Sequence, residues 1–464
     1  MVESGTFGGF RASLAEQIAA SLSGPMREAT PRRMRGTVAL PGKVTAVIGM
    51  RRSGKTTYLH QLRRQRLERG IEQKFLPYIN FEDERLSGLQ MHDLSLLVEE
   101  YYRQVPAARG QHVVTWCLDE VQVVDGWERF ARRLLDTEKI ELFVSGSSAA
   151  LLSREVATSL RGRGWEVVIY PFSFEEYLLH HRGLGVPGPE DRLVPAERSR
   201  LEGALLEYLA CGGFPEAQGL ATADRQRLLA DYVDVAMLRD VVERHNVSNV
   251  TGLRWLVRHL LGNPAGKFSV ERFHGALKSQ GVAISRDTVH ELLGFLEDCF
   301  LVRTVWVEAD SERRRMVNPR KAYPVDPGLI PVFDRTGRAN LGHALETAVM
   351  IELARRRCEV TYVRTEAGHE VDFLARHPGG SMQLVQVCAD LDASATRERE
   401  VRALVAASSE HPRATLHLIT LTPETAHAIP EEISLHSAVE WFLQPRLESE
   451  DGGRGRPDRT ARQR

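Results

Sequence analysis

Residues 49–57 carry the clearest chemical pattern in the chain, reading Gly-Met-Arg-Arg-Ser-Gly-Lys-Thr-Thr. The start of this stretch fits G-x-x-x-x-G-K-[ST], in which glycines let backbone N–H groups close around phosphate oxygens. The lysine of the pattern reaches the β and γ phosphates, and the hydroxyl that follows it joins a magnesium shell. We therefore predict ATP and Mg²⁺ as cofactors, Thr56 as a metal ligand, and these nucleotide-binding residues: Gly49, Arg52, Ser53, Gly54, Lys55, Thr56 and Thr57.

A coincidental glycine-rich turn is the competing interpretation of this stretch. The frequencies of glycine, lysine and Ser/Thr give that coincidence odds on the order of one in a hundred or lower. An apolar run at 44–48 precedes the pattern, and a helix-like segment from Lys55 to about Arg69 follows it. The local order is then strand, loop and helix, which favours the nucleotide site further.

A second pattern is the apolar run 113–118, which ends in Asp119 and Glu120. Open α/β sheets present their ligands at the carboxyl ends of the strands. In a nucleotide site, the aspartate would hold the metal and the glutamate would orient and polarise the attacking water. Taken alone, such a pair is as often a loop start. The upstream phosphate pattern favours Asp119 as a metal ligand and Glu120 as a catalytic residue.

Three further side chains are candidates for contact with the γ phosphate. Ser145 ends an apolar run at 140–145 and would sense the phosphate or position the water, with a hydroxyl-capped turn as a nearly equal alternative. Arg161 and Arg163 lie on an expected loop. A guanidinium there would stabilise transition-state charge at a neighbouring subunit, and a solvated loop arginine is the alternative at about even odds.

The elements that must position these residues alternate between strands and helices. Alternation of this kind builds a mainly parallel sheet covered on both faces. We predict the fold class α/β, with a P-loop ATPase domain at 36–182 after a lead-in at 1–35. The expected strands lie at 44–48, 75–81, 113–118, 140–145 and 166–170, with helices such as 94–104 and 127–136 between them.

The rest of the chain divides into two further folded parts. A glycine- and proline-rich linker at 183–189 precedes a helical and winged-helix section at 196–310. A small α/β domain is expected at 340–443, with a helix to about Arg357 and three strands after it. Residues 446–464 have almost no apolar side chains, so we predict a disordered tail.

The composition is that of a folded protein in a reducing compartment. Apolar residues make up 42% and charged residues 27% of the chain. The 61 basic and 62 acidic side chains nearly cancel, so the whole molecule offers no long-range attraction for nucleic acid or anionic membrane. The five cysteines are scattered, and no run approaches the ~18 apolar residues of a spanning helix. We predict a cytoplasmic protein.

Several short motifs follow one another along the chain in a specific order. They are 51–56 (Arg-Arg-Ser-Gly-Lys-Thr), 118–122 (Leu-Asp-Glu-Val-Gln), 145–148 (Ser-Gly-Ser-Ser), 170–174 (Tyr-Pro-Phe-Ser-Phe), 211–215 (Cys-Gly-Gly-Phe-Pro), 344–347 (Ala-Leu-Glu-Thr) and 370–374 (Glu-Val-Asp-Phe-Leu). Together they resemble the prokaryotic AAA-family ATPases that carry a characteristic C-terminal domain of unknown function. The resemblance covers residues 36 to about 443.

In that family the C-terminal domain is similar to restriction-endonuclease-like folds, whose metal site uses a helix Glu, a strand Asp and a following Glu-x-Lys. Glu346 and Asp372 match the first two, with ordinary polar contacts as the alternative. The third position reads Gln386-Val387-Cys388, and no lysine follows Lys321. Because arginine is a poor proton relay, the resemblance implies a nuclease-like domain whose nuclease activity is doubtful.

We predict that the chain is a slow ATP hydrolase acting as a nucleotide-driven switch or remodeller. The alternative is a DNA-binding ATPase of genome maintenance, mobile elements or defence. In that alternative, Arg286 begins a recognition helix and Arg303 and the arginines 313–315 lie near the DNA backbone. A signalling scaffold is a third class. Besides ATP, the candidate partners are DNA, a second copy of the chain or another protein, and no membrane.

Overall fold

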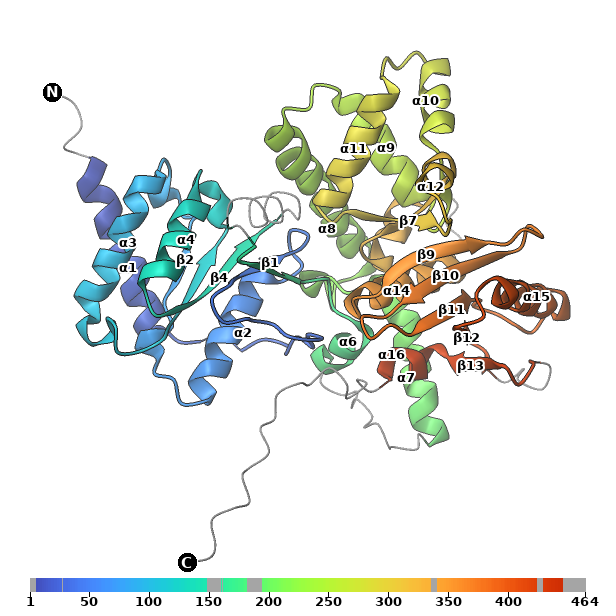
Figure 1. Ribbon diagram of the computed structural model, residues 1–464, viewed down its shortest axis with the longest axis horizontal. Coiled ribbons are helices and arrows are strands. Elements are labelled where there is room, and N and C mark those ends of the chain that lie inside the picture. The colour runs from blue at the N-terminus through green and yellow to red at the C-terminus, as the bar shows by residue number, and fades with distance from the viewer. Residues whose placement is uncertain are drawn as a thin grey trace, which may run out of the picture.

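The computed structural model describes residues 6–26, 28–147, 160, 162–181, 194–334, 340–423 and 429–444. Within these residues the chain forms two sheets, and a helical section lies between them in the sequence (Figure 1). The first sheet belongs to the blue and cyan N-terminal part and most of the second to the orange and red C-terminal part. Arg161, the predicted linker at 183–189 and the predicted tail at 446–464 lie outside the described residues.

The first sheet has five strands, all parallel, in the order β2-β3-β4-β1-β5. β1 and β3 are buried along their whole lengths, which is the pattern of strands covered on both faces. The predicted α/β class with a parallel P-loop sheet is confirmed. The strands are β1 (Val44–Ile48), β2 (Tyr78–Asn80), β3 (Val114–Asp119), β4 (Ile140–Gly146) and β5 (Gly164–Val168).

The strand predicted at 75–81 is shorter in the structure. A 3₁₀ turn, η1, occupies Gln73–Phe75, and β2 begins only at Tyr78. Pro77 has no N–H to donate to a strand ladder, although its carbonyl accepts a hydrogen bond of 3.0 Å from the Cys117 N–H. This proline explains the late start of the strand.

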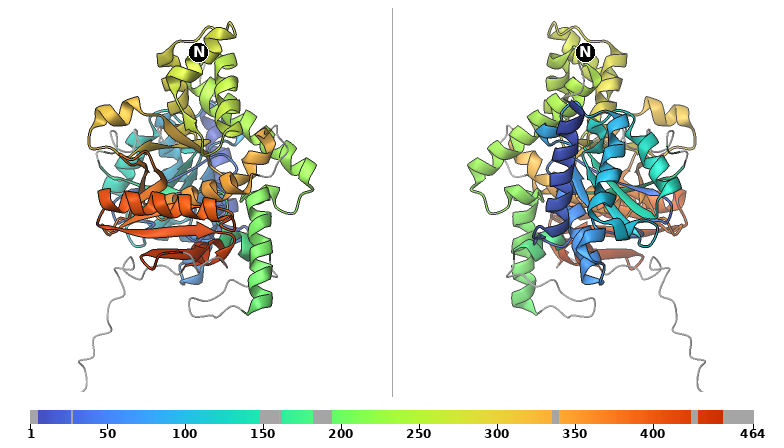
Figure 2. Two further views of the ribbon diagram at one scale, coloured as in Figure 1. Left: turned by 90° about the vertical axis from the view of Figure 1, so that its right-hand side faces the viewer. Right: turned by 90° about the vertical axis from the view of Figure 1, so that its left-hand side faces the viewer.

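Four helices cover the first sheet: α1 (Thr6–Ser23), α2 (Lys55–Glu68), α3 (Leu94–Gln104) and α4 (Trp127–Thr137). α1 packs against α3 and β2, and the right-hand view of Figure 2 shows it in dark blue beside this unit. Leu14 and Ile18 of α1 are fully buried in the same core as the sheet. The segment predicted as a lead-in thus supplies part of this core.

The helical section follows β5, the last strand of the first sheet, in the sequence. Its helices are α6 (Phe174–His180), α7 (Pro195–Cys211), α8 (Thr222–Val235), the π-helix η7 (Ala236–Glu243), α9 (Val250–Gly262), α10 (Val270–Ser279) and α11 (Arg286–Asp298). α8 and η7 follow each other without a break. η7 also packs against α11.

Two glycines fix the approach of this section to its neighbours. The Gly213 N–H donates to Asp326 Oδ2 at 2.7 Å, and its carbonyl accepts from the Phe172 N–H at 2.6 Å. A Cβ at Gly213 would lie 2.2 Å from the Phe172 carbonyl oxygen, and one at Gly212 would lie 1.8 Å from Asp326 Oδ1. Because no side chain fits at either position, the segments around Phe172, Gly213 and Asp326 can pack this closely only with glycine there.

The second sheet has eight strands in the order β13-β12-β11-β10-β9-β7-β8-β6. Its strands are β6 (Lys267–Phe268), β7 (Val302–Val307), β8 (Arg320–Pro324), β9 (Glu359–Arg364), β10 (Glu370–Arg376), β11 (Met382–Val387), β12 (Ala414–Thr420) and β13 (Ile433–Ser437). The accompanying helices are α12 (Glu312–Val317), α13 (Ile330–Phe333), α14 (Leu341–Arg355), α15 (Ser394–Glu410) and α16 (Ala438–Leu443).

This sheet includes strands from both the predicted section at 196–310 and the predicted domain at 340–443. Trp306 and Val307 of β7 pair in parallel with Thr361 and Tyr362 of β9. The strands β6, β8 and β7, which lie beside the helices α9, α10 and α11, therefore continue directly into the C-terminal strands. α14 and α15 pack into different hydrophobic clusters of the C-terminal strands, and Phe373 and Leu374, consecutive in β10, join one cluster each.

No described helix combines the length and the apolar character that crossing a bilayer requires.

Candidate functional site

The loop between β1 and α2 is shaped by three residues with positive φ. Gly49, Arg52 and Gly54 have φ values of 147°, 65° and 101°. A Cβ at Gly49 would lie 2.2 Å from the Ile169 carbonyl oxygen, so only glycine fits beside β5. α2 begins immediately afterwards at Lys55, and the loop therefore wraps around the N-terminal end of a helix, where backbone N–H groups attract anions.

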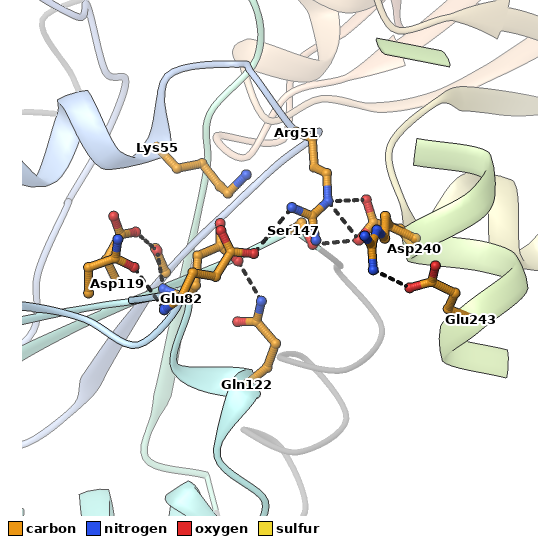
Figure 3. Close-up of polar contacts among 12 residues, drawn as sticks. Arg51, Lys55, Glu82, Asp119, Gln122, Ser147, Asp240 and Glu243 are labelled. Atoms are coloured by element: carbon orange, nitrogen blue, oxygen red, sulfur yellow. Dashed lines mark hydrogen bonds and ion pairs between the residues drawn. The ribbon is translucent and has the colours of Figure 1, made fainter. Parts of the chain in front are cut away.

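Two side chains of this loop are buried. Lys55, labelled in Figure 3, is 5% exposed. Its Nζ donates to the Met50 carbonyl at 3.2 Å. Burial lowers the pKa of Lys55, while the charges of Glu120, Asp119 and Asp240 act in the opposite direction. The Ser53 hydroxyl is fully buried and has no hydrogen-bond partner within the described part of the chain. The loop thus offers a polar group that none of the described residues satisfies.

Asp119 ends β3. Because β3 and β4 are parallel neighbours, Ser145 near the carboxyl end of β4 lies beside Asp119. Both carboxylate oxygens accept hydrogen bonds, Oδ1 from the Ser145 hydroxyl and Oδ2 from the Tyr78 hydroxyl at 2.7 Å. The same Ser145 oxygen accepts from the Glu120 N–H at 3.0 Å. Asp119 and Glu120 therefore form one connected group with Ser145, which lies 25 residues after Glu120 in the sequence.

Glu120 adopts a left-handed backbone with φ 52°. This conformation costs a residue with a side chain on the order of 1–3 kcal/mol and occurs preferentially at functional sites. Its carboxylate accepts a hydrogen bond from the Gln122 side chain (Figure 3). The turn directs Glu120 away from the strand and leaves it next to the end of β4.

The other predicted residues lie in different surroundings. Thr56 and Thr57 are exposed in the first turn of α2, and the exposed Arg52 pairs with Glu216 at 3.2 Å. Arg163 pairs with Asp136, and its carbonyl accepts from the N–H of Val44 at the start of β1. The loop with Lys55 follows the opposite end of β1, so Arg163 does not reach the site of its own chain. Arg161 is outside the described residues.

A cavity of about 690 Å³ opens beside this loop and has Gly54, Thr57 and Gln61 in its wall. Segment 28–32, which precedes β1, forms the opposite side together with Phe172 and His180. The volume falls within the roughly 300–1,000 Å³ of small-molecule sites. The cavity therefore extends from the phosphate-type loop along the first turns of α2.

Arg32 is a buried charged residue of this wall that sequence reasoning did not identify. Its side chain is 4% exposed, stacks 5.0 Å above the Phe172 ring and donates from Nη2 to the Tyr170 carbonyl. Nε lies 3.5 Å from Glu176, but neither Nε nor Nη1 has a hydrogen-bond partner among the described residues. Nη1 is 3.9 Å from the place of a Gly54 Cβ, so these free donors lie beside the loop.

Arg51, Glu82, Ser147 and Asp240 were also missed. Arg51 Nε donates to both Asp240 oxygens at 3.1 and 2.9 Å, and its Nη1 donates to Glu82 at 3.3 Å. The Ser147 hydroxyl donates to Asp240 Oδ1 at 2.7 Å. Asp240 lies 189 residues after Arg51, inside an apolar helical stretch, so no local pattern connects the two.

A second polar cluster lies in the second sheet and contains Lys321, which sequence reasoning did not assign to it. Lys321 of β8 is 4% exposed, and its Nζ lies 2.8 Å from Asp372 and 3.1 Å from Glu346. Gln386 accepts from the Asp372 N–H at 3.2 Å and donates to Glu400 at 2.7 Å. We had expected no lysine to serve Glu346 and Asp372, because none follows Lys321. The antiparallel pairing of β8 beside β7 instead brings that earlier lysine to them.

Charge and burial explain the state of this cluster. Burial and the neighbouring charge of Asp372 raise the pKa of Glu346 to about 7. Burial acts to lower the pKa of Lys321, but the carboxylates of Asp372, Glu346 and Glu370 outweigh burial and raise this pKa overall. The lysine is therefore the cation that balances these carboxylates. Within the described residues, no group of three or more His, Cys, Asp or Glu side chains is arranged to hold a metal.

The comparisons with known proteins agree with the geometry of the loop. Residues 41–178 match the family described as "AAA domain", and residues 202–338 match a domain of unknown function, DUF8612. The first part of the chain is an AAA-type P-loop domain, and at the level of this family the match supports an ATP-binding ATPase.

Two relatives extend over most of the chain. The uncharacterized protein MJ1544 of Methanocaldococcus jannaschii is 32% identical over 369 residues, which are 78% of each chain. An uncharacterized protein of Haemophilus influenzae is 29% identical over 334 residues, covering 72% of this chain and 79% of its own. The chain belongs to the family of MJ1544.

Among solved structures, the Walker-type ATPase of Pyrococcus abyssi matches 70% of this chain and 95% of its own, with 14% identity and a TM-score of 0.39.

Proposed function

We propose that the chain binds ATP with Mg²⁺ and hydrolyses it, as a nucleotide-driven switch or remodeller. One observation carries the proposal: the loop around Lys55 and the pair Asp119 and Glu120 lie together at the carboxyl ends of β1 and β3. Figure 3 shows Lys55 beside these carboxylates. Ser145 joins the pair to the neighbouring strand.

The loop would hold the triphosphate. Its backbone N–H groups and the Lys55 ammonium face the space that the β and γ phosphates would take, and the unsatisfied Ser53 hydroxyl is a further donor. Thr56 and Asp119 are the candidate Mg²⁺ ligands, because hydroxyl and carboxylate oxygens are the ligands this ion prefers. When bound, Mg²⁺ would neutralise charge that develops on the phosphate oxygens.

Glu120 is the candidate for activating water. The Glu120 N–H donates to Ser145, and its carboxylate accepts a hydrogen bond from Gln122. From this position the carboxylate would orient and polarise the attacking water. The cavity beside Gly54 would take the nucleoside, with Arg32 and Phe172 in its wall. Arg161 and Arg163 would act only on a neighbouring copy of the chain.

Segments next to the first sheet contact α14, which packs against the second sheet, and a nucleotide cycle would change these contacts. Arg35, just before β1, pairs with Glu352 of α14 at 3.0 Å, and Arg355 of α14 donates to the Pro171 carbonyl. Arg52 of the loop pairs with Glu216 of the helical section. Movement of the loop on binding ATP would therefore pull on segments far along the chain, which supports a switch.

Replacement of the candidate water-activating residue tests the proposal. Glu120→Gln should lower ATP turnover by about 100-fold or more and leave ATP binding intact, because the amide keeps the shape and loses the base. Glu72→Gln is the matched control, since Glu72 is exposed and pairs only with Lys74. Turnover that is unchanged in Glu120→Gln would overturn the assignment.

DNA binding is the second candidate function, favoured by the order of elements around β6. The chain order α9, β6, α10, α11, β7, β8 and the sheet order β6-β8-β7 match the order expected of a winged-helix unit, which supports this candidate. The hairpin β7–β8 contains α12, whose Arg313 and Arg314 are exposed. These arginines are suited to phosphate contacts.

Salt dependence tests this candidate. Duplex binding by the full chain should weaken steeply with salt, and Arg313→Ala with Arg314→Ala should weaken it and lower the slope of log K against log salt by about 2. No duplex binding at low salt would refute it.

We also infer that the cluster around Lys321 does not cut nucleic acid. The lysine already balances Glu346 and Asp372, and Gln386 takes the place of a third carboxylate. Full-length protein with Mg²⁺ or Mn²⁺ should leave plasmid DNA intact. Cleavage that Asp372→Asn abolishes would contradict this inference.

A further inference from the structure

Asp240 of η7 is a buried residue that links the nucleotide loop to the helical section. It is 2% exposed, although a carboxylate is rarely buried unless it is paired. Arg51 leaves the loop between β1 and α2 and places its Nε between the two Asp240 oxygens, at 3.1 and 2.9 Å. Figure 3 shows this pair bridging the loop and the helix.

A second group of the same site reaches Asp240. Ser147 directly follows β4, and its hydroxyl donates to Asp240 Oδ1 at 2.7 Å. Two residues earlier on the same strand, Ser145 contacts Asp119 and Glu120. The end of β4 thus touches the candidate metal ligand through one hydroxyl and the helical section through the other.

The guanidinium of Arg51 has a fixed orientation as a result. Its Nε side is held by Asp240, whereas its Nη1 has, among the described residues, a contact with the half-exposed Glu82 at 3.3 Å. A planar guanidinium anchored on one edge presents its remaining N–H groups in a set direction. Glu82 belongs to a loop after β2, so its contact is one that a phosphate oxygen could replace without breaking the buried pair.

Electrostatics favours this arrangement. Burial acts to lower the pKa of Arg51, but the charges of Asp240 and Glu120 outweigh burial and raise this pKa overall. The guanidinium therefore stays charged. Arg244, one turn along the helix from Asp240, adds a further positive charge at 3.8 Å. A short π-helix places Asp240 here, and such helices are frequent at functional sites.

We propose that Asp240 is a positioning residue of the nucleotide site: it orients Arg51 so that the terminal amino groups of the guanidinium bind the γ phosphate of ATP. The inference rests on the proposed function. It makes the site depend on a residue outside residues 41–178, the part that matches the AAA domain. Nucleotide occupancy is thereby linked to η7 and to α11, against which η7 packs.

The ratio of the affinities for ATP and ADP tests the proposal, because only ATP has the γ phosphate. Calorimetric titration of the full chain with each nucleotide should show that Arg51→Gln and Asp240→Asn both reduce the preference for ATP by about tenfold or more. The double variant should be no worse than Arg51→Gln alone, since the two residues act as one unit. Glu243→Gln is the matched control on the same helix, where Glu243 is exposed and pairs with Arg239.

The conservative variant Arg51→Lys keeps the test valid if Asp240→Asn does not fold. A lysine retains the charge but lacks the planar fork that offers one edge to the carboxylate and the other to the phosphate, so it should lose the preference for ATP as well. A wild-type preference in Arg51→Lys, or in a folded Asp240→Asn, overturns the proposal. Absence of ATP binding by the unaltered chain would instead remove the proposed function itself.

Discussion

Arg32 offers a sharp prediction, because it lies in the wall of the cavity that we propose for the nucleoside. Among the described residues, its buried Nε and Nη1 have no hydrogen-bond partner, and the cavity beside them has a volume of about 690 Å³. An unsatisfied buried donor costs about 1–3 kcal/mol, and a hydrogen bond from a charged group contributes about 1.5–3 kcal/mol. We expect Arg32→Met to weaken ATP binding by about 10-fold to 150-fold.

The replacement should leave the fold intact. Arg32 contacts Glu176 only at 3.5 Å, whereas Glu176 also accepts from the Arg33 N–H at 2.6 Å and from the Ser173 N–H at 2.9 Å. The carboxylate therefore stays satisfied. Arg33→Met is the matched control, because the Arg33 side chain is 46% exposed and pairs with Glu175 on the surface.

Calorimetric titration with ATP and with inorganic tripolyphosphate separates the two ends of the site. Arg32→Met should bind tripolyphosphate as the unaltered chain does and lose affinity for ATP alone. An equal loss for both ligands would place Arg32 at the phosphates, and no loss for either would refute the reasoning.

Three further predictions concern other parts of the molecule. Gly49→Ala should abolish ATP binding and cost more than about 2 kcal/mol of stability, measured by chemical denaturation, because the new Cβ meets the Ile169 carbonyl; wild-type binding would contradict it. Burial, with His436 and His377, lowers the pKa of His417 to about 4. Between pH 4 and about pH 6.5 the unfolded chain therefore binds more protons than the folded chain. The free energy of unfolding should fall by up to about 2 kcal/mol from pH 7.5 to pH 5, and by less in His417→Gln. An equal fall in the two proteins would refute this prediction. Arg163→Ala should lower turnover only if copies of the chain assemble, which a turnover assay across protein concentrations would reveal.

Patterns with local causes predicted much of the first sheet. The run 44–48 and the glycine-framed loop after it follow from nearest-neighbour chemistry, and β1 and α2 begin at the expected residues. The strand expected at 75–81 was overestimated because the effect of Pro77 was not weighed. The domain boundaries and the roles of the site residues stay predictions.

Contacts between distant segments could not be read from spacing. Asp240 resembles any polar residue on an amphipathic helix until the fold brings it to Arg51. Lys321 precedes Glu346 and Asp372 in the chain, and only the strand pairing of β8 places it between them. Arg32 lies in a segment whose burial depends on α2 and Phe172, which the sequence does not show as neighbours.

The most direct test of the account is equilibrium binding of ATP with Mg²⁺ to the full chain and to Lys55→Ala. Lys55 is buried in the loop and carries the positive charge nearest to the expected phosphates. We predict saturable binding by the unaltered chain and at least about a 100-fold loss in the folded variant. Equal affinity in the two proteins, or no binding by either, would contradict the claim that this loop holds the triphosphate.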